Sequence, residues 1–313
     1  MFFADPSSFA GRSTDWQDLV FQKGITQSHQ LSISGGTEKS RYYISGYYVD
    51  QSGLLKNTNQ NKFAIRSNLE SKINNKTSIS LGLLGGRTNS SNNGDIGGKG
   101  NPVTGALAWA PTEQVYDSLN LYNRNSVSPI WSNPYMILKE RNNKTFSNYA
   151  LLNGKLSYKF TNWLSLDIVL GLNLENAKSA YLNNDWISPG NPSSGQSQSE
   201  SYTFQNSNIL TFHKTFNQQH DLTIVALEEA SSNKYSSFNA DGSGLSSTSN
   251  GYYNLGLNTS QSISSAYSNW ALLSFMGRVS YSYNGKYLVN ATFRADGSSK
   301  FQTTANKWGY FPL

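Results

Sequence analysis

The sequence predicts an all-β protein: a partial antiparallel transmembrane β-barrel of about ten strands, with short turns at one end and long loops at the other. Three observations support this fold class. Apolar and polar residues alternate along many segments, as they do in strands with one apolar face. The connections between these segments are alternately short and long. Aromatic residues make up 13% of the chain and charged residues only 14%, whereas roughly 25% charged residues is typical of a soluble domain.

The clearest predicted strand is the segment WLSLDIVLGLNLE, residues 163–175. One face carries the aliphatic residues Leu164, Leu166, Ile168, Leu170, Leu172 and Leu174. The other face is mostly polar or small and is interrupted only by Val169. Six successive aliphatic residues on one face extend over about 34 Å, whereas a typical strand of a globular sheet is roughly 17–20 Å long.

The same alternation recurs along the chain and gives ten predicted strands. They lie around residues 31–34, 41–48, 63–70, 78–83, 146–160, 163–175, 203–216, 220–232, 268–283 and 286–296. In the last of them, Tyr287, Val289, Ala291 and Phe293 share a face. We expect this face to meet lipid and the opposite, polar face to meet the barrel lumen.

The connections divide into two kinds that alternate along the chain. The short ones are residues 35–40, 74–77, 160–163, 216–221 and 283–286, and the long ones are roughly 50–60, 87–145, 183–200 and 235–265. Short periplasmic turns and long extracellular loops are typical of a transmembrane barrel. A soluble β-sandwich has no reason to separate its loops by length in this way.

Aromatic residues are concentrated beside the short turns. They are Tyr42, Phe160, Trp163, Phe216, Tyr281, Tyr283 and Tyr287. Such a row is typical of the girdle at a membrane interface, where an aromatic ring lies in the apolar layer and its polar group reaches water. Cross-strand aromatic packing in a soluble sheet is the alternative.

We expect two parts in the chain: a leading segment, residues 1–27, and the partial barrel, residues 28–313, with a long extracellular loop at 87–145. A connection of that length usually has a binding or gating role. The N-terminal stretch MFFADPSSFAGR lacks the features of a signal peptide. The longest apolar run has five residues, so no transmembrane helix is predicted. The basic residues behind the net charge of +6 are scattered, which argues against a nucleic-acid partner.

The sequence predicts no catalytic, cofactor or metal site, and therefore no enzyme. The chain contains no cysteine, and none of its three histidines, His29, His213 and His220, has a partner at metal-ligand spacing. Asp167 and Glu175 lie about 27 Å apart on one strand, which is too far for a general acid–base pair. Loop aromatic residues are candidates for stacking on sugar rings, with loop packing as the alternative: Trp109, Trp131, Tyr116, Tyr122 and Trp186.

Several stretches resemble the SusC/RagA-like family of TonB-dependent outer-membrane transporters. They are TDWQD (14–18), HQLSISGG (29–36), GYYVDQSGLLKNT (46–58), LLSFMGRVSYSYNGKYLVNATFRADGSSKF (272–301) and NKWGYFP (306–312). The last two are the most specific. The resemblance implies a plugged barrel of 22 strands, a size known for such transporters. Because ten strands are too few for that barrel, we expect an internal fragment of it, without the plug, the TonB-contacting box or a signal peptide.

The resemblance also implies a function and partners. It implies energised uptake of a glycan, oligosaccharide or peptide across the outer membrane of a Gram-negative, Bacteroidetes-like cell. The implied partners are the outer-membrane lipids, a SusD-like surface lipoprotein, and TonB through the plug region that this sequence lacks. No cofactor is expected. Two alternatives remain open: an outer-membrane β-barrel adhesin without transport, and a soluble secreted carbohydrate-binding β protein.

Overall fold

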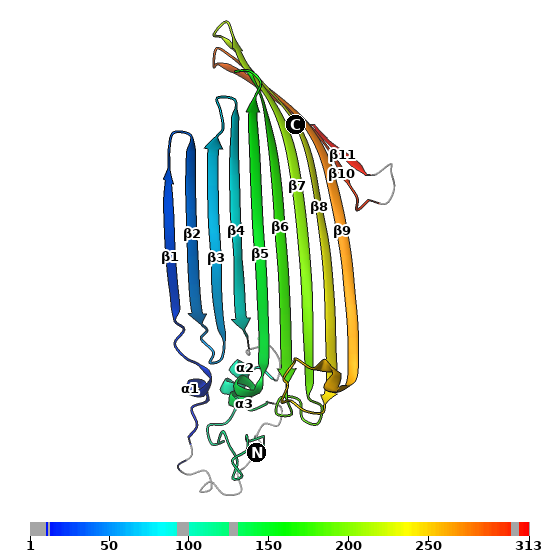
Figure 1. Cartoon of the computed structure of the whole chain (residues 1–313). Helices are drawn as coiled ribbons and strands as arrows, with labels where there is room; N and C mark the ends of the chain where they lie inside the picture. The colour runs from blue at the N-terminus through cyan, green and yellow to red at the C-terminus, as the bar shows by residue number, and fades with distance from the viewer. Residues whose placement is uncertain (1–10, 12, 93–99, 125–130, 302–306, 313) are drawn as a thin grey trace.

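Antiparallel strands form one open sheet in which each strand pairs with the next along the chain (Figure 1). The computed structural model describes residues 11, 13–92, 100–124, 131–301 and 307–312, and within these ranges the sheet has eleven strands. The strands are β1 (Thr26–Gly36), β2 (Ser40–Ser52), β3 (Asn59–Lys72), β4 (Thr77–Ser91), β5 (Asn142–Lys159), β6 (Leu164–Asn183), β7 (Ser193–Phe216), β8 (His220–Leu245), β9 (Asn258–Tyr283), β10 (Tyr287–Ser298) and β11 (Trp308–Pro312). The all-β antiparallel fold class is confirmed.

The structure differs from the sequence prediction at the strand ends. The sequence pattern missed β11, five residues that pair with β10 from Phe293↔Pro312 to Gly297↔Trp308. Several strands also continue well past the predicted segments, and β8 and β9 each have 26 residues. Their outer parts are rich in Ser and Asn on both faces, so the apolar alternation disappears there although the backbone pairing continues.

The register places the aliphatic residues of neighbouring strands on one face. Directly paired residues share a face of a sheet, and one such row is Leu69↔Leu81↔Gly154↔Leu170. We call this side, which carries the even-numbered residues of β6, the apolar face, and the other side the polar face. Many side chains on the apolar face are exposed, among them Leu31 (82%) and Leu170 (47%). The described residues therefore leave this face without a cover.

One polar cluster interrupts the apolar face near the middle of β7 and β8. Asn208 donates hydrogen bonds from Nδ2 to Glu228 Oε2 (2.6 Å) and to Asn206 Oδ1 (2.9 Å). Asn206 in turn donates to the backbone oxygen of Val169 (3.2 Å). These hydrogen bonds satisfy polar atoms that an apolar surrounding would otherwise leave unpaired.

The short turns lie at one end of the sheet and the long connections at the other (Figure 1). The β9–β10 hairpin has an Asn-Gly turn in which both Asn284 and Gly285 have positive φ, 53° and 67°, as a type I′ turn requires. Aromatic pairs lie at the short-turn end. They are Tyr158–Phe160, Trp163–Phe212 and Tyr283–Tyr287, with ring centroids 5.0, 5.4 and 6.4 Å apart.

Short helices form a small core at the long-loop end. They are α1 (Trp16–Val20), α2 (Pro102–Ala108) and α3 (Pro134–Glu140), and a 3-10 helix, η2, covers Leu255–Leu257. Trp16 and Val20 are buried against Ala106, Trp109 and Leu138. The leading segment thus folds onto the long loop, although its residues 1–10 and 12 lie outside the described ranges. No helix among the described residues is long and apolar enough to cross a membrane.

Side-chain caps fix the two helices of the long loop. Asn101 and Asn133 accept hydrogen bonds from backbone N–H groups in the first turns of α2 and α3, and a proline follows each cap at a position where no N–H is needed. Asn133 is only 1% exposed and also donates from Nδ2 to the backbone oxygens of Val115 (3.0 Å) and Asn123 (3.2 Å). This segment is therefore a folded unit rather than an extended connection.

Candidate ligand-binding site

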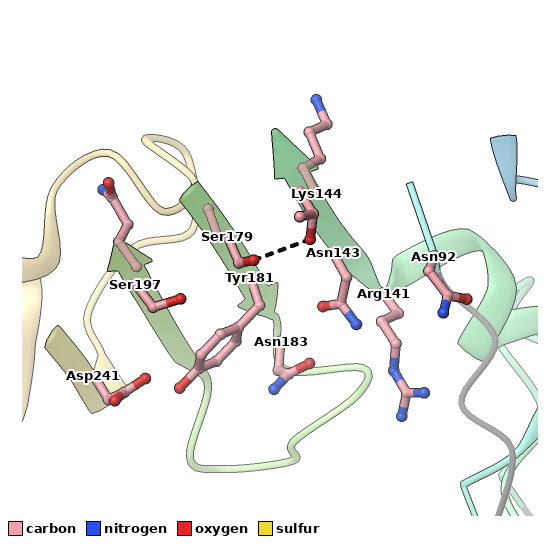
Figure 2. Close-up of a pocket in the computed structure, with 12 residues that line it drawn as sticks. Asn92, Arg141, Asn143, Lys144, Ser179, Tyr181, Asn183, Ser197 and Asp241 are labelled. Carbon is pink, nitrogen blue, oxygen red and sulfur yellow. Dashed lines mark hydrogen bonds between the residues drawn. The ribbon is translucent and has the colours of Figure 1, made fainter. Parts of the chain in front are cut away.

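A polar pocket of about 560 Å³ lies at the long-loop end of the sheet (Figure 2). Strands β5 to β8 supply most of its walls, and Asn92 and Arg141 come from the segments that precede α2 and β5. The lining is rich in amides and hydroxyls: Asn92, Asn143, Thr145, Ser179, Tyr181, Asn183, Gln196 and Ser197, with the charged residues Arg141, Lys144 and Asp241 and with Ala180. The volume lies within the range of small-molecule pockets, about 300–1,000 Å³.

The strand register brings the central residues of the pocket into one row. Asn143 on β5 pairs with Tyr181 on β6, Tyr181 pairs with Gly195 on β7, and Gly195 pairs with Asp241 on β8. Directly paired residues point to the same face. The row therefore lies on the polar face, beyond the aliphatic stretch that ends at Leu174.

Gly195 allows Tyr181 and Asp241 to meet across β7. A Cβ atom at position 195 would overlap both Asp241 Oδ1 and the Tyr181 ring. Burial raises the pKa of the Tyr181 hydroxyl to about 12, and the hydrogen bond to Asp241 and its negative charge add to this effect. At neutral pH the hydroxyl is thus protonated and donates to the carboxylate. Because the folded-state pKa is raised, this stabilisation is present below pH 10 and is lost as the pH rises through about 12.

We expect Gly195→Ala to separate Tyr181 from Asp241 and to lower the pKa of Tyr181 from about 12 towards 10. Both overlapping groups are the far ends of side chains, which can move away from the new methyl group, so the sheet should remain folded. The measurement is the ultraviolet titration of tyrosine, with the spectrum of the matching Tyr181→Phe variant subtracted. Gly277→Ala is the control, because a Cβ there meets no atom within 4 Å. An unchanged Tyr181 pKa in Gly195→Ala would contradict this role for the glycine.

Opposite charges lie on two sides of the pocket. Figure 2 shows Asp241 on one side and Arg141 on the other, with the amides of Asn143 and Asn183 between them. Arg141 is the C-cap residue that follows α3, and within the described ranges no ion pair involves it. The pocket thus offers a guanidinium donor, a carboxylate acceptor and several neutral hydrogen-bonding groups to a polar ligand.

A cluster of four aromatic residues is connected to the pocket through Glu140 and Asn184, which are sequence neighbours of the pocket residues Arg141 and Asn183. It consists of Tyr116, Tyr122, Tyr135 and Trp186. Tyr122 stacks on Tyr116 (5.3 Å) and meets Trp186 edge to face (5.0 Å). Glu140, next to Arg141, accepts hydrogen bonds from the Tyr122 hydroxyl (2.9 Å) and from Asn184 (2.7 Å), next to Asn183. Burial raises the pKa of Tyr122, and the hydrogen bond to Glu140 and the negative charge of that carboxylate raise it further.

The loop aromatics expected to stack on sugars divide into two groups. Trp109 is only 3% exposed, packs edge to face on Trp16 and donates from Nε1 to the backbone oxygen of Trp131 (3.1 Å), so loop packing is its role. Trp131 packs against the same core. Tyr116, Tyr122 and Trp186 instead belong to the aromatic cluster beside the pocket. The sequence did not predict Tyr135 as a member of this cluster, and it did not predict the row of Asn143, Tyr181, Gly195 and Asp241.

The described residues contain no group of three His, Cys, Asp or Glu side chains that is arranged to hold a metal ion. His213 lies 3.1 Å from Asp221, and His220 lies 2.6 Å from the Tyr281 hydroxyl, both at the short-turn end. Asp167 is paired with Lys155 (2.9 Å), while Glu175 accepts a hydrogen bond from Asn173 (3.0 Å). These carboxylates belong to the hydrogen-bonded lining of the polar face.

Sequence comparison finds relatives over almost the whole chain. No family model matches it. TonB-dependent receptor P3 of Formosa agariphila is 31% identical over 312 residues, which cover 96% of this chain and 31% of the relative. TonB-dependent receptor SusC of Bacteroides thetaiotaomicron is 26% identical over 340 residues, which cover 98% of this chain and 32% of the relative. The chain spans about a third of the length of these curated relatives, which are receptors and not enzymes.

Solved structures show the same fold. The RagAB peptide transporter matches with a TM-score of 0.82 at 22% identity, over 96% of this chain and 35% of that one. The ferripyoverdine receptor of Pseudomonas aeruginosa matches with a TM-score of 0.55 at 14% identity, over 92% of this chain and 38% of the receptor. The open sheet thus has the fold of part of a receptor barrel. Along nearly its whole length the chain is therefore similar to about a third of the length of TonB-dependent receptors that include SusC, and it shares the fold of the corresponding part of the RagAB transporter.

Proposed function

We propose that the chain forms part of the barrel wall of an outer-membrane transporter that takes up a peptide or an oligosaccharide and is energised through TonB. The observation that carries the proposal is the polar pocket at the long-loop end of a sheet whose opposite face is apolar. In a membrane barrel the long loops are extracellular, so the pocket would be the first site at which a ligand from outside meets the lumen wall.

A peptide is the ligand class that the charges of the pocket favour. A peptide carries a carboxylate that Arg141 can bind with two parallel hydrogen bonds, and an ammonium group that complements Asp241. Its backbone amides match the Asn and Gln side chains that line the pocket. Uptake of peptides is also what is described for the structural relative RagAB.

An oligosaccharide is the second candidate, and the aromatic cluster favours it. Tyr116 is 40% exposed and stacks on Tyr122, while Trp186 lies against Tyr122 and under the Arg124 guanidinium, 4.8 Å from the ring centre. Aromatic rings bury the C–H faces of sugars, and nearby amides bind the hydroxyls. In this case the aromatic cluster would hold the ligand and the charges of the pocket would matter less.

The proposal includes location and partners. The apolar face would meet outer-membrane lipid, since exposed aliphatic residues in a barrel wall face the bilayer. A SusD-like surface lipoprotein would cover the long-loop end, and TonB would act through a plug. The sequence relatives in Formosa and Bacteroides support a Bacteroidetes-like outer membrane as the location.

The test is calorimetric binding of a peptide library and an oligosaccharide library to the full-length product of the gene. For a peptide ligand, we expect Arg141→Ala and Asp241→Asn each to weaken binding about tenfold or more, as is typical for loss of a hydrogen bond to a charged group. For an oligosaccharide, Trp186→Ala should weaken binding more than either charge variant. Lys159→Gln, at the short-turn end, removes a charge far from the pocket and is the control.

Uptake by cells completes the test. The proposal predicts that accumulation of the bound ligand stops when TonB is deleted, although binding at the surface persists. Binding without TonB-dependent accumulation would instead support the adhesin alternative. A protein that folds as a monomer without detergent would support the soluble carbohydrate-binding alternative.

A further inference from the structure

Three basic side chains surround one phenylalanine on the apolar face. Arg87 on β4 lies with its Cζ 5.4 Å from the ring centre of Phe146 on β5. Lys178 on β6 is directly paired with Phe146, and Lys144 lies two residues before Phe146 on β5. We call Arg87, Lys144 and Lys178 the basic patch. Its members share one face of three adjacent strands, and in the register they fall at the levels of positions 144, 146 and 148 of β5.

Arg87 and Lys178 lie on the side of the sheet opposite the row around Gly195, and Lys144, which also borders the pocket, directs its side chain to that same opposite side. Position 178 has the same parity along β6 as the aliphatic row that ends at Leu174, and position 87 has the same parity along β4 as Leu83. Figure 2 shows the Lys144 side chain directed away from Asn143 and Arg141. Each of Lys178 and Arg87 lies four residues past an aliphatic residue of its own strand. The patch therefore borders the apolar face on its long-loop side.

Nothing in the described part of the chain neutralises the patch. All three side chains are exposed, and none takes part in an ion pair there. Glu200, the acidic residue on the same face of the adjoining β7, accepts hydrogen bonds from Asn176, Gln198 and Tyr202. Arg87 is held in place by a hydrogen bond from its Nε to Asn89 Oδ1 (2.8 Å). Among the described residues the patch thus has no ion-pair partner, and one of its three members, Arg87, is oriented by a hydrogen bond.

An anionic lipid fits this combination. Basic clusters at the edge of a membrane-facing surface attract phosphorylated headgroups, and an aromatic ring at that level is typical of the interface. Ordinary solvent-exposed charges need not lie at the border of an aliphatic surface, whereas charges that bind lipid headgroups must. On the same face, Leu83 and Leu174 lie four residues from Arg87 and Lys178, and Leu152 is paired with Leu83. Acyl chains attached to a bound headgroup would run over these residues.

We propose that the basic patch binds the phosphate groups of an anionic lipid of the outer leaflet, with its acyl chains on the adjacent apolar face. The proposal rests on the orientation of the apolar face towards lipid, and its test changes Arg87 and Lys178, which do not line the pocket.

Native mass spectrometry of the full-length gene product in detergent tests the proposal, with bis-phosphorylated lipid A as the probe. We expect the wild type to retain lipid A and the double variant Arg87→Gln/Lys178→Gln to bind it at least about tenfold more weakly, since each basic residue near a membrane surface contributes to the attraction. The control is Lys76→Gln/Lys159→Gln, which removes two positive charges at the short-turn end and should bind within about twofold of wild type. Far-ultraviolet circular dichroism checks that both double variants are folded.

Two results would overturn the proposal. One is equal retention of lipid A by the patch variant and the wild type, or an equal loss in the control variant. The other is displacement of lipid A by inorganic phosphate at the same concentration, because the site would then recognise phosphate without the acyl chains. Loss of retention when the lipid A phosphates are removed, with acyl chains intact, supports the proposal. Ligand uptake is not the readout, so failure of the transport proposal would leave this result unchanged.

Discussion

Leu170→Arg is expected to destabilise the folded protein in a bilayer by about 2–4 kcal/mol, the cost measured for a basic residue at the middle of the lipid-facing side of a barrel. Leu170 is central in the aliphatic row of β6, is 47% exposed and lies on the apolar face beside Leu81 and Gly154. A guanidinium there would have to lie in hydrocarbon or reach out along the surface. Unfolding by guanidinium chloride from lipid vesicles, followed by tryptophan fluorescence, measures the difference.

The matched control is Asn173→Arg, three residues further along the same strand but on the polar face. Asn173 donates a hydrogen bond to Glu175 (3.0 Å), and an arginine in its place would find the same carboxylate within reach. We expect a change within about 0.5 kcal/mol, as for most surface substitutions. Equal destabilisation by both variants would contradict the assignment of the two faces.

Trp16→Ala is the second large effect, and it concerns the long-loop end. Trp16 is 3% exposed, packs edge to face on Trp109 and donates from Nε1 to the backbone oxygen of Ala110 (3.0 Å). Truncating a buried tryptophan costs about 3–5 kcal/mol. This cost is close to the whole stability of a small helical unit, so we expect the loop that holds α2 and α3 to become sensitive to protease while the strands stay paired.

Leu107→Ala provides the comparison for this variant. Leu107 lies in α2 but is 67% exposed, so its truncation removes no core contact and should leave the rate of loop cleavage within about twofold of wild type. Limited proteolysis with mass mapping of the fragments gives both rates. If Trp16→Ala were cleaved no faster than Leu107→Ala, the leading segment would not be what holds the long loop together.

The period-two pattern was sufficient to predict the fold class, because a lipid-facing strand needs aliphatic residues on one side only. It predicted the strand of residues 163–175 well, since six aliphatic residues there share a face. It failed where both faces are polar: the outer half of β8 is rich in Ser and Asn, and its pairing with β9 is fixed by backbone hydrogen bonds that leave no hydrophobic period. β11 was missed because five residues are too few to show a period.

The candidate site was largely beyond the reach of the sequence. Asn143, Tyr181, Gly195 and Asp241 are far apart along the chain and become neighbours only through the register of three strand pairs. A register shift of one residue would place them on the other face, and no local pattern fixes it. The same holds for the basic patch, whose residues look like scattered charges in the sequence. The loop aromatics were recognisable as a class, but only the packing separates the buried Trp109 from the aromatic cluster beside the pocket.

The most direct test of the central claim is a single-cysteine scan of residues 164–175 in lipid vesicles. The 313 residues contain no cysteine, so each introduced thiol would be the one labelled in this chain. With a spin label attached at each position, we predict high collision rates with oxygen, which concentrates in lipid, at positions 164, 166, 168, 170, 172 and 174. We predict high collision rates with a water-soluble nickel complex at the positions between them. Access of the nickel complex to both sets of positions would contradict the account, because the apolar face would then meet water.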